Sequence, residues 1–303
     1  MAPRESESFR RSKIQLYSRL KLKNIFPGEW ESIYTGDGIE FMGIKPFEPG
    51  DDLRDLDLCA LVRSGEEEII ERVSGRQLRV FIWADLSGSL QKSKEALFPA
   101  RREIRDMAIG ILAFSSWNAY SPVGLCAFDR EIRKFFPAKP GESYCQEMLD
   151  WVLDREYAGP VGADIPKAIG FLMERVLPQS LVFFISDFQD PFFGDDFFDL
   201  IRPAADKFDF IPVVIRDPLE KNISLARSAI LSVGGDEGDD HRTLYLTPRR
   251  LREIQEASGR HLAHLERNFR RAGVSHVVLD SASSDDCYDA LSGLFQTRRR
   301  APL

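Results

Sequence analysis

Three oxygen-bearing side chains follow one another at two-residue spacing in the stretch VFIWADLSGSL: those of Asp85, Ser87 and Ser89. A carboxylate and two hydroxyls are hard ligands, and they suit Mg²⁺, Mn²⁺ or Ca²⁺ better than zinc. The same residue types are also common in turns, because Asp and Ser side chains bond to nearby backbone amides. The stretch therefore has two interpretations, a cation site or an ordinary turn at the end of a strand.

A second aspartate, Asp187, ends the apolar run SLVFFISDF as Asp85 ends its own run. In doubly wound parallel sheets, functional groups gather beyond the carboxyl ends of the strands, where the strand order reverses. If the two runs are neighbours at that point, both carboxylates face one crevice, and the hydroxyls of Ser87 and Ser89 turn back towards it. The simpler alternative is that Ser186 and Asp187 cap the next helix. The recurrence of the pattern on two similar strands favours the shared site.

The elements that position these residues alternate between apolar strands and amphipathic helices. We expect helices over residues 144–153, 165–176, 195–207, 248–272 and 285–295, and one with an apolar face between 97 and 112. Strands are expected at LRVFIWAD, SLVFFISDF, 210–215 and VSHVVLD, and SPVGLCAFD with EIRKFFPA predicts a hairpin whose second strand lies at a sheet edge. Continuous apolar strands are typical of sheets with helices on both faces. The alternation predicts an α/β protein with a doubly wound, mostly parallel sheet.

The first quarter of the chain has a different character. Residues 24–75 are rich in glycine, proline and charge, which favours short strands and turns. We expect a small N-terminal β-rich or extended segment over residues 1–75 and the α/β domain over residues 76–303. Within that domain, GGDEGDDH lacks the spacing of an EF-hand and is predicted to be a mobile loop in an irregular stretch.

Composition excludes several classes of protein. The 303 residues are 43% hydrophobic and 29% charged, with a net charge of −7, which argues against generic binding to nucleic acid or anionic membranes. No apolar run reaches the length of a membrane span, and the polar start of the chain lacks the pattern of a signal peptide. The four cysteines form no CxxC pair and are expected as buried free thiols rather than zinc ligands. We expect a cytoplasmic protein of bacterial type.

The stretch DLSGS resembles the D-x-S-x-S motif of von Willebrand factor A domains, in which these residues form a metal-ion-dependent adhesion site. Upstream, GIEFMGIKPFEPGDDLRDLD resembles the bacterial family known as domain of unknown function 58. The family residues retained are Gly38, Glu40, Phe41, Pro49, Gly50, Asp51, Asp52, Arg54 and Asp57, and the departures are Lys45, Phe47 and Leu58. PVGLCAFD, ISDF and DPLE also fit, so the resemblance extends from about Ile25 to the C-terminus. It implies a von Willebrand A-like domain.

One ligand of that motif is missing. Von Willebrand A domains supply a threonine from a later loop, whereas GPVGADIPKAIG places Ala163 at that position. Three outcomes follow for the expected Mg²⁺ or Mn²⁺. The ion is held weakly by Asp85, Ser87, Ser89 and Asp187, or Asp164 swings in as an additional ligand, or the site is lost and the fold alone serves binding.

Catalytic motifs are harder to find. The chain has no G-x-S-x-G elbow and no P-loop, and a phosphatase of the haloacid dehalogenase type would need an aspartate where Ser87 stands. We therefore expect a non-enzymatic, protein-binding adaptor, and the family resemblance implies a MoxR-type AAA+ ATPase as its partner. The alternatives are a metal-independent scaffold with a vestigial site and a Mg²⁺-dependent phosphoester hydrolase that uses Asp85 and Asp187.

Three further patterns have structural interpretations. EPGDDLRDLD predicts an ion pair of Arg54 that braces the N-terminal segment. His261 and His264 lack the glutamate of H-E-x-x-H and are expected as a solvated or helix-flanking pair. The phenylalanines in DFQDPFFGDDFFDL are expected either in the core or in an apolar interaction patch beside Asp187.

Overall fold

The computed structural model describes residues 37–46, 68–76, 78–90, 101–153, 162–189, 195–217, 220, 229–234 and 241–300. The chain divides into two compact units, one of residues Pro27–Leu78 and one that combines Met1–Phe26 with Arg79–Leu303. The sequence analysis instead expected the boundary after residue 75, with residues 1–26 in the smaller unit. That division remains a prediction.

In the described part of the smaller unit, two strands, β1 (Asp37–Pro46) and β2 (Glu68–Arg76), pair in antiparallel fashion. The pairing register shifts between Phe41 and Gly43, which is the signature of a β-bulge. The turn-rich, glycine-containing sequence here thus forms strands longer than the short ones that we expected. The EPGDDLRDLD stretch lies outside the described residues.

The larger unit is built on a six-stranded sheet in the order β10-β7-β6-β3-β4-β5. Its strands are β3 (Val80–Asp85), β4 (Val123–Phe128), β5 (Ile132–Lys139), β6 (Leu181–Ser186), β7 (Asp209–Ile215) and β10 (Val277–Leu279). All neighbouring pairs are parallel except β4 with β5, and β5 lies at the sheet edge. Every residue of β3, β4 and β6 is buried, as expected for strands covered on both faces. The predicted α/β fold class is confirmed.

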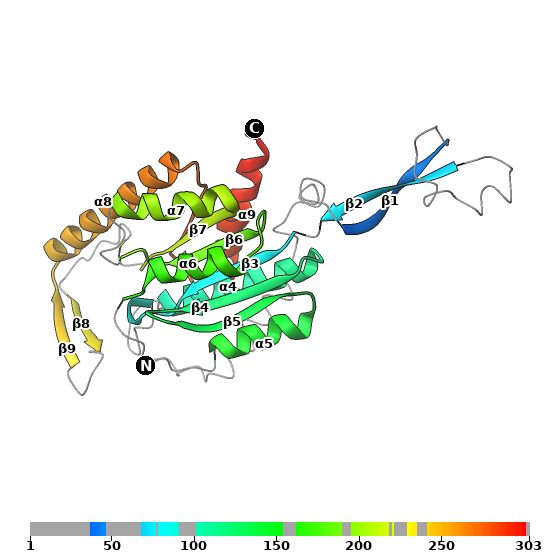
Figure 1. Cartoon of the computed structure of the whole chain (residues 1–303). Helices are drawn as coiled ribbons and strands as arrows, with labels where there is room; N and C mark the ends of the chain where they lie inside the picture. The colour runs from blue at the N-terminus through cyan, green and yellow to red at the C-terminus, as the bar shows by residue number, and fades with distance from the viewer. Residues whose placement is uncertain are drawn as a thin grey trace. The chain divides into compact units, whose positions relative to one another are not determined.

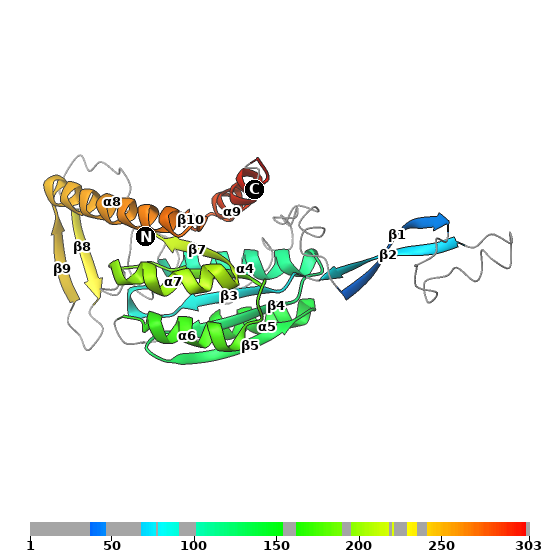
Figure 2. The ribbon, with the colours of Figure 1, turned by 45° about the horizontal axis from the view of Figure 1, so that its top comes forward.

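Helices cover both faces of this sheet (Figure 1). They are α4 (Arg101–Asn118), α5 (Glu142–Leu153), α6 (Ile165–Arg175), α7 (Asp195–Lys207), α8 (Pro248–Arg271) and α9 (Ser284–Arg300). Helix α4 contacts α5 and α9, while α6 contacts α7. In both ribbon views α6 and α7 lie on the near face and α4 on the far face (Figure 1, Figure 2).

A buried tryptophan fixes α6 against the strand that carries Asp85. Trp83 has no exposed surface, and its indole Nε1 donates to the carbonyl of Ala168 in α6 at 3.1 Å. It belongs to an apolar cluster that also includes Phe184 of β6 and Phe269 of α8. A buried indole finds a partner because an unpaired N–H would be costly. The position of β3 is therefore set by packing as well as by the strand ladder.

The structure corrects one expectation in the later part of the chain. The stretch predicted to be irregular contains β8 (Ala229–Gly234) and β9 (His241–Leu246), which form an antiparallel pair (yellow in Figure 2). The two short strands were not predicted, because the stretch GGDEGDDH between them is acidic and rich in glycine. Residues 235–240, most of the predicted loop, lie outside the described residues.

The expectations for the cysteines are confirmed where these residues are described, and those for the phenylalanines after Asp187 concern side chains that the structure does not describe. Cys126, Cys145 and Cys287 are buried free thiols, as predicted, whereas Cys59 is not described. The side chains of Phe192, Phe193, Phe197 and Phe198 are likewise outside the description. Among the helices of the described ranges, none is both long and apolar enough to cross a membrane.

Candidate functional site at the carboxyl ends of β3 and β6

The two aspartates singled out by their positions after apolar runs lie at adjacent strand ends. β3 and β6 are parallel neighbours, and the strand order reverses between them, with β4 on one side and β7 on the other. Asp85 is the last residue of β3 and Asp187 the first after β6, with exposed fractions of 2% and 5%. The expected juxtaposition at the switch point is therefore present.

Both carboxylate oxygens of Asp85 accept hydrogen bonds from the protein. The backbone N–H of Ser87 donates to Oδ1 at 2.7 Å, and the hydroxyl of Ser186 donates to Oδ2 at 2.7 Å. The Ser186 hydroxyl in turn accepts from the backbone N–H of Phe188 at 3.2 Å. Ser186 thus joins the two strand ends, which sequence reasoning missed because it treated this serine as a helix cap.

The environment of Asp85 disfavours its charge. Burial raises the pKa of the Asp85 carboxyl from 3.8 to about 6, and the nearby charge of Asp187 adds to the rise. The hydrogen bonds from Ser87 and Ser186 oppose this effect, because they stabilise the ionised form. The Asp85 carboxyl therefore takes up and releases its proton at a pH well above the usual range for aspartate.

Asp187 is held by an arginine that the sequence did not single out. Nη1 of Arg101, the first residue of α4, lies 3.0 Å from Oδ2 of Asp187. The backbone N–H of Gln189 donates to Oδ1 at 3.2 Å. Nη2 of the same guanidinium forms an ion pair with Glu220, so that Arg101 bridges two buried carboxylates.

Glu220 is the centre of a second set of contacts. Its Oε2 accepts from the Ser258 hydroxyl at 2.6 Å and from Arg216 Nε at 3.3 Å, and its Oε1 accepts from Gln189 Nε2 at 3.2 Å. Burial by itself would raise the pKa of Glu220, but Arg101, Ser258 and Arg216 together hold that pKa below its usual value. Glu220 is therefore an ionised, fully engaged carboxylate that extends the site to α8.

Of the remaining predicted ligands, Ser87 lies beside Asp85, whereas Asp164 caps a helix. Ser87 is buried beside Asp85, and its hydroxyl also bonds to that carboxylate. Ser89 lies in the short 3₁₀ turn Gly88–Leu90, but its side chain is outside the description. Asp164 caps α6 by accepting from the Lys167 N–H at 2.9 Å, and Ala163 packs into the apolar core. The structure gives Asp164 a capping role and shows it bonded to neither Asp85 nor Asp187.

These residues fit a divalent cation only in part. Asp85, Ser87 and Asp187 would supply oxygen ligands from neighbouring strand ends. However, positive charge is already supplied to Asp187 by Arg101. Across the described ranges, no group of three or more His, Cys, Asp or Glu side chains is placed to hold a metal ion.

Of the two arrangements expected for the histidines of α8, the solvated one does not match the structure. Both are half-buried, and His261 Nε2 lies 2.7 Å from the carbonyl oxygen of Phe188. Because a carbonyl only accepts, Nε2 carries the proton. His264 Nε2 lies 3.0 Å from the side-chain amide of Asn268. His261 therefore ties α8 to the loop that carries Asp187.

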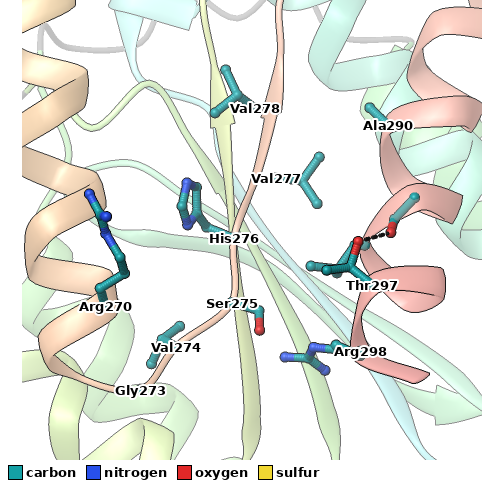
Figure 3. Close-up of a pocket in the computed structure, with 12 residues that line it drawn as sticks. Arg270, Gly273, Val274, Ser275, His276, Val277, Val278, Ala290, Thr297 and Arg298 are labelled. Carbon is teal, nitrogen blue, oxygen red and sulfur yellow. Dashed lines mark hydrogen bonds between the residues drawn. The ribbon is translucent and has the colours of Figure 1, made fainter. Parts of the chain in front are cut away.

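A separate hollow lies at the β10 edge of the sheet, between α8 and α9 (Figure 3). This cavity of about 560 Å³ includes Arg270, His276 and Arg298 in its lining. Burial lowers the pKa of His276, and Arg298 is paired with Asp209 at 2.9 Å. None of the residues predicted as ligands lines this hollow.

Together, the doubly wound sheet and the polar cluster at its switch point define an α/β protein with a candidate binding site at the carboxyl ends of β3 and β6. The model of the family described as "Protein of unknown function DUF58" matches residues 43–264, and the chain belongs to this family. The predicted family resemblance is confirmed.

Two curated relatives match the chain over nearly its whole length. "Uncharacterized protein Mb1516" of Mycobacterium bovis and "Uncharacterized protein Rv1480" of Mycobacterium tuberculosis are each 21% identical to the chain over 292 residues. The matches cover 96% of this chain and 89% of each relative.

Solved structures with some similarity include the conserved hypothetical protein BatB from Bacteroides thetaiotaomicron. The match has 15% identity and a TM-score of 0.43, and covers 74% of this chain and all of that one. An aerotolerance-related membrane protein from Bacteroides fragilis matches with 13% identity and a TM-score of 0.43 over 73% of this chain and 99% of that one.

Proposed function

We propose that the protein is a non-enzymatic, protein-binding adaptor whose larger unit is a von Willebrand A-like domain. In this proposal, partners are recognised at the carboxyl ends of β3 and β6. The observation that carries the proposal is the pairing of Asp85 and Asp187 at the switch point, with Ser87 and Ser186 arranged around Asp85. Ligands of open α/β sheets are bound at such points.

The buried polar groups support binding rather than mere fold stability. Buried carboxylates are costly unless they are compensated, and apolar side chains would satisfy a purely structural requirement more simply. Burial and the nearby charge of Asp187 raise the pKa of Asp85, and among the described residues no arginine forms an ion pair with its carboxylate. A polar group retained under such conditions at a switch point is a candidate for contact with a ligand.

The bound ion in this proposal is Mg²⁺ or Mn²⁺, held by Asp85, Ser87, Ser89 and Asp187. Such an ion would attract an acidic side chain of the partner. Asp164 is a weaker candidate ligand, because its carboxylate already caps α6.

The partner in this proposal is a MoxR-type AAA+ ATPase, which the family resemblance implies. A gene for such an ATPase beside the gene for this chain would support the assignment. We expect the protein to act in the cytoplasm, with no nucleic acid partner.

Binding to the purified ATPase tests the proposal directly. The full chain would be immobilised, and the dissociation constant of the neighbouring MoxR-type ATPase measured with and without Mg²⁺. Asp85→Asn and Asp187→Asn are each expected to weaken binding about tenfold or more, as for loss of a central charged contact. Asp289→Asn, an exposed change on α9, is the matched control and leaves binding unchanged. Absence of binding by the wild-type chain, or equal binding by all three variants, would overturn the proposal.

A further inference from the structure

We propose that the outer side of β10 accepts an extended, acidic peptide of a partner protein as a further strand of the sheet. The peptide would lie in the hollow between α8 and α9, which we call the β10 groove (Figure 3). None of the residues at the carboxyl ends of β3 and β6 lines this groove. The inference therefore goes beyond the proposed function and does not depend on it.

Strand β10 has one side without a strand partner. Within the described ranges it pairs with β7 alone, in parallel. The carbonyl of Leu279 accepts from the Arg216 N–H at 2.8 Å, so the backbone groups of Leu279 are directed towards β7. Because backbone groups alternate from side to side along a strand, the N–H and C=O of Val278 are directed out of the sheet. Such an edge is a template for another strand.

The two edges of the sheet differ in how they are protected. The opposite edge strand, β5, has exposed Lys134, Pro137 and Lys139, and lysine and proline are residues with which proteins prevent the addition of a strand. Strand β10 (Val277–Leu279) contains neither. Its three residues offer few main-chain hydrogen bonds, so the side chains of the groove must supply part of the affinity and most of the specificity.

The β10 groove has room for a peptide beside this strand. Its volume of about 560 Å³ lies within the range of about 300–1,000 Å³ that is typical of binding pockets. On the α9 side, the lining includes Ala290 and Gly293, which have small side chains or none. A methyl group added to Gly293 would meet nothing within 4 Å among the described residues. Helix α9 therefore leaves space beside β10.

The charge of the groove favours an acidic peptide. Its lining includes Arg270, His276 and Arg298 and, among the described residues, no carboxylate, although the chain carries a net charge of −7. Arg298 pairs with Asp209 at 2.9 Å, and Glu266 lies 3.9 Å from His276 outside the lining. Arg270 is exposed, and its Nε donates to a backbone carbonyl of its own helix. We therefore assign contact with the acidic side chain to Arg270.

The two walls of the groove set the pattern of the peptide. Successive side chains of a strand point to opposite faces of the sheet. One set would face Arg270 on α8, and the other would face Ala290 and Gly293 on α9 (Figure 3). The inference thus specifies a segment in which acidic and small apolar residues alternate.

Fluorescence anisotropy with the full chain and a synthetic peptide tests the inference. The probe is a labelled peptide of about ten residues with alternating glutamate and valine, in buffer with a chelator. We expect a dissociation constant of about 100 μM or tighter. A peptide of alternating lysine and valine should bind more weakly, although the net charge of the chain would favour it. N-methylation of either the glutamate or the valine amides, but not of both sets alike, should weaken binding at least about tenfold, because alternate amides face one neighbouring strand.

Variants of the chain locate the peptide. Gly293→Leu fills the groove and should weaken binding about tenfold or more, whereas Gly170→Leu, at a helical glycine of α6 with similar space, is the control. Val278→Pro removes an outward N–H, which an edge strand tolerates, and should have a similar effect to Gly293→Leu. Arg270→Gln should weaken binding about two- to fivefold, as for an exposed ion pair, and less in about 0.5 M NaCl. Arg267→Gln, an exposed change on the same helix, should match wild type.

Three results would overturn the inference. The first is no binding of the glutamate–valine peptide by wild type, and the second is equal affinity of wild type and folded Gly293→Leu or equal binding of the parent and both N-methylated peptides. The third is a dimer in analytical ultracentrifugation that Val278→Pro dissociates, because β10 would then pair with a second copy. If Val278→Pro does not fold, Gly293→Leu and the methylated peptides still decide the matter. No ATPase or divalent ion is used, so failure here is distinct from failure of the adaptor proposal.

Discussion

Asp85 shows how a single buried carboxyl can make stability depend on pH. It is 2% exposed, and its pKa rises from 3.8 to about 6 because burial disfavours the charged form. The folded state therefore binds this proton at higher pH than the unfolded chain does. Between pH 3.8 and about 6, the folded state holds more protons, so the contribution of Asp85 to the free energy of unfolding falls as pH rises.

Asp85→Asn is expected to remove this contribution. As pH rises from 3.8 to about 6, the free energy of unfolding of wild type should fall by up to about 3 kcal/mol relative to that of the variant. Above that range the difference should not change further. Urea unfolding at a series of pH values, in buffer containing a chelator, measures the difference. A wild-type-minus-variant difference that stays constant with pH would show that the Asp85 carboxyl titrates normally.

At the scale of elements, the start of α6 separates a structural role of Asp164 from a ligand role. Its side chain accepts from the Lys167 N–H and satisfies one of the free amides of the first helical turn. Asp164→Ala should cost about 1 kcal/mol, whereas Asp164→Ser, which preserves a capping oxygen, should cost much less. Denaturant melts give both values. A fall in Mn²⁺ affinity with both variants at unchanged stability would instead support the ligand role.

The β4–β5 pair offers a second test of an element. A methyl group on Gly124 would lie 2.7 Å from the Phe136 carbonyl oxygen and 2.7 Å from the Phe81 ring. Gly124→Ala should therefore destabilise the protein by about 1–3 kcal/mol, since a well-packed interior resists added volume. Gly170→Ala is the control. Its added methyl meets nothing within 4 Å on α6, and the change should be neutral or stabilising by up to about 1 kcal/mol. Equal melting temperatures of the two variants would contradict this packing argument.

The parts of the site that sequence could predict are those marked by a change in periodicity. Asp85 and Asp187 each interrupt an apolar run, and parallel strands bring such ends to one edge. Arg101 could not be found in this way, because the start of an amphipathic helix does not show where a long side chain turns. Glu220 lies in the DPLE stretch that contributed to the family resemblance, but only the fold brings it to Arg101. The strands β8 and β9 were missed because each is short and a charged turn separates them.

At the scale of the larger unit, the polar cluster joins segments that are distant in sequence. Arg101 begins α4, Asp187 follows β6, Arg216 follows β7 and Ser258 lies within α8. Glu220 bonds to residues of all four segments, because Gln189 lies in the loop after β6. His261 adds a further connection between α8 and the loop after β6. The same groups that surround the proposed binding edge therefore hold the helical layer to the sheet.

Removal of Glu220 should accordingly be costly for the whole unit. Glu220→Gln leaves Arg101 and Arg216 with one fewer anionic partner in a largely buried position, and should cost about 3 to 5 kcal/mol at neutral pH. Because the pKa of Glu220 is held below its usual value of 4.5, the stability it adds is present above that value and is lost as pH falls through the lowered pKa. Urea unfolding of wild type and Glu220→Gln should therefore converge in acid. Glu174→Gln, an exposed change on α6, should remain within about 0.5 kcal/mol of wild type at every pH. A Glu220→Gln variant as stable as wild type at neutral pH would show that the arginines are satisfied without Glu220, and that this cluster does not hold α8 to the sheet.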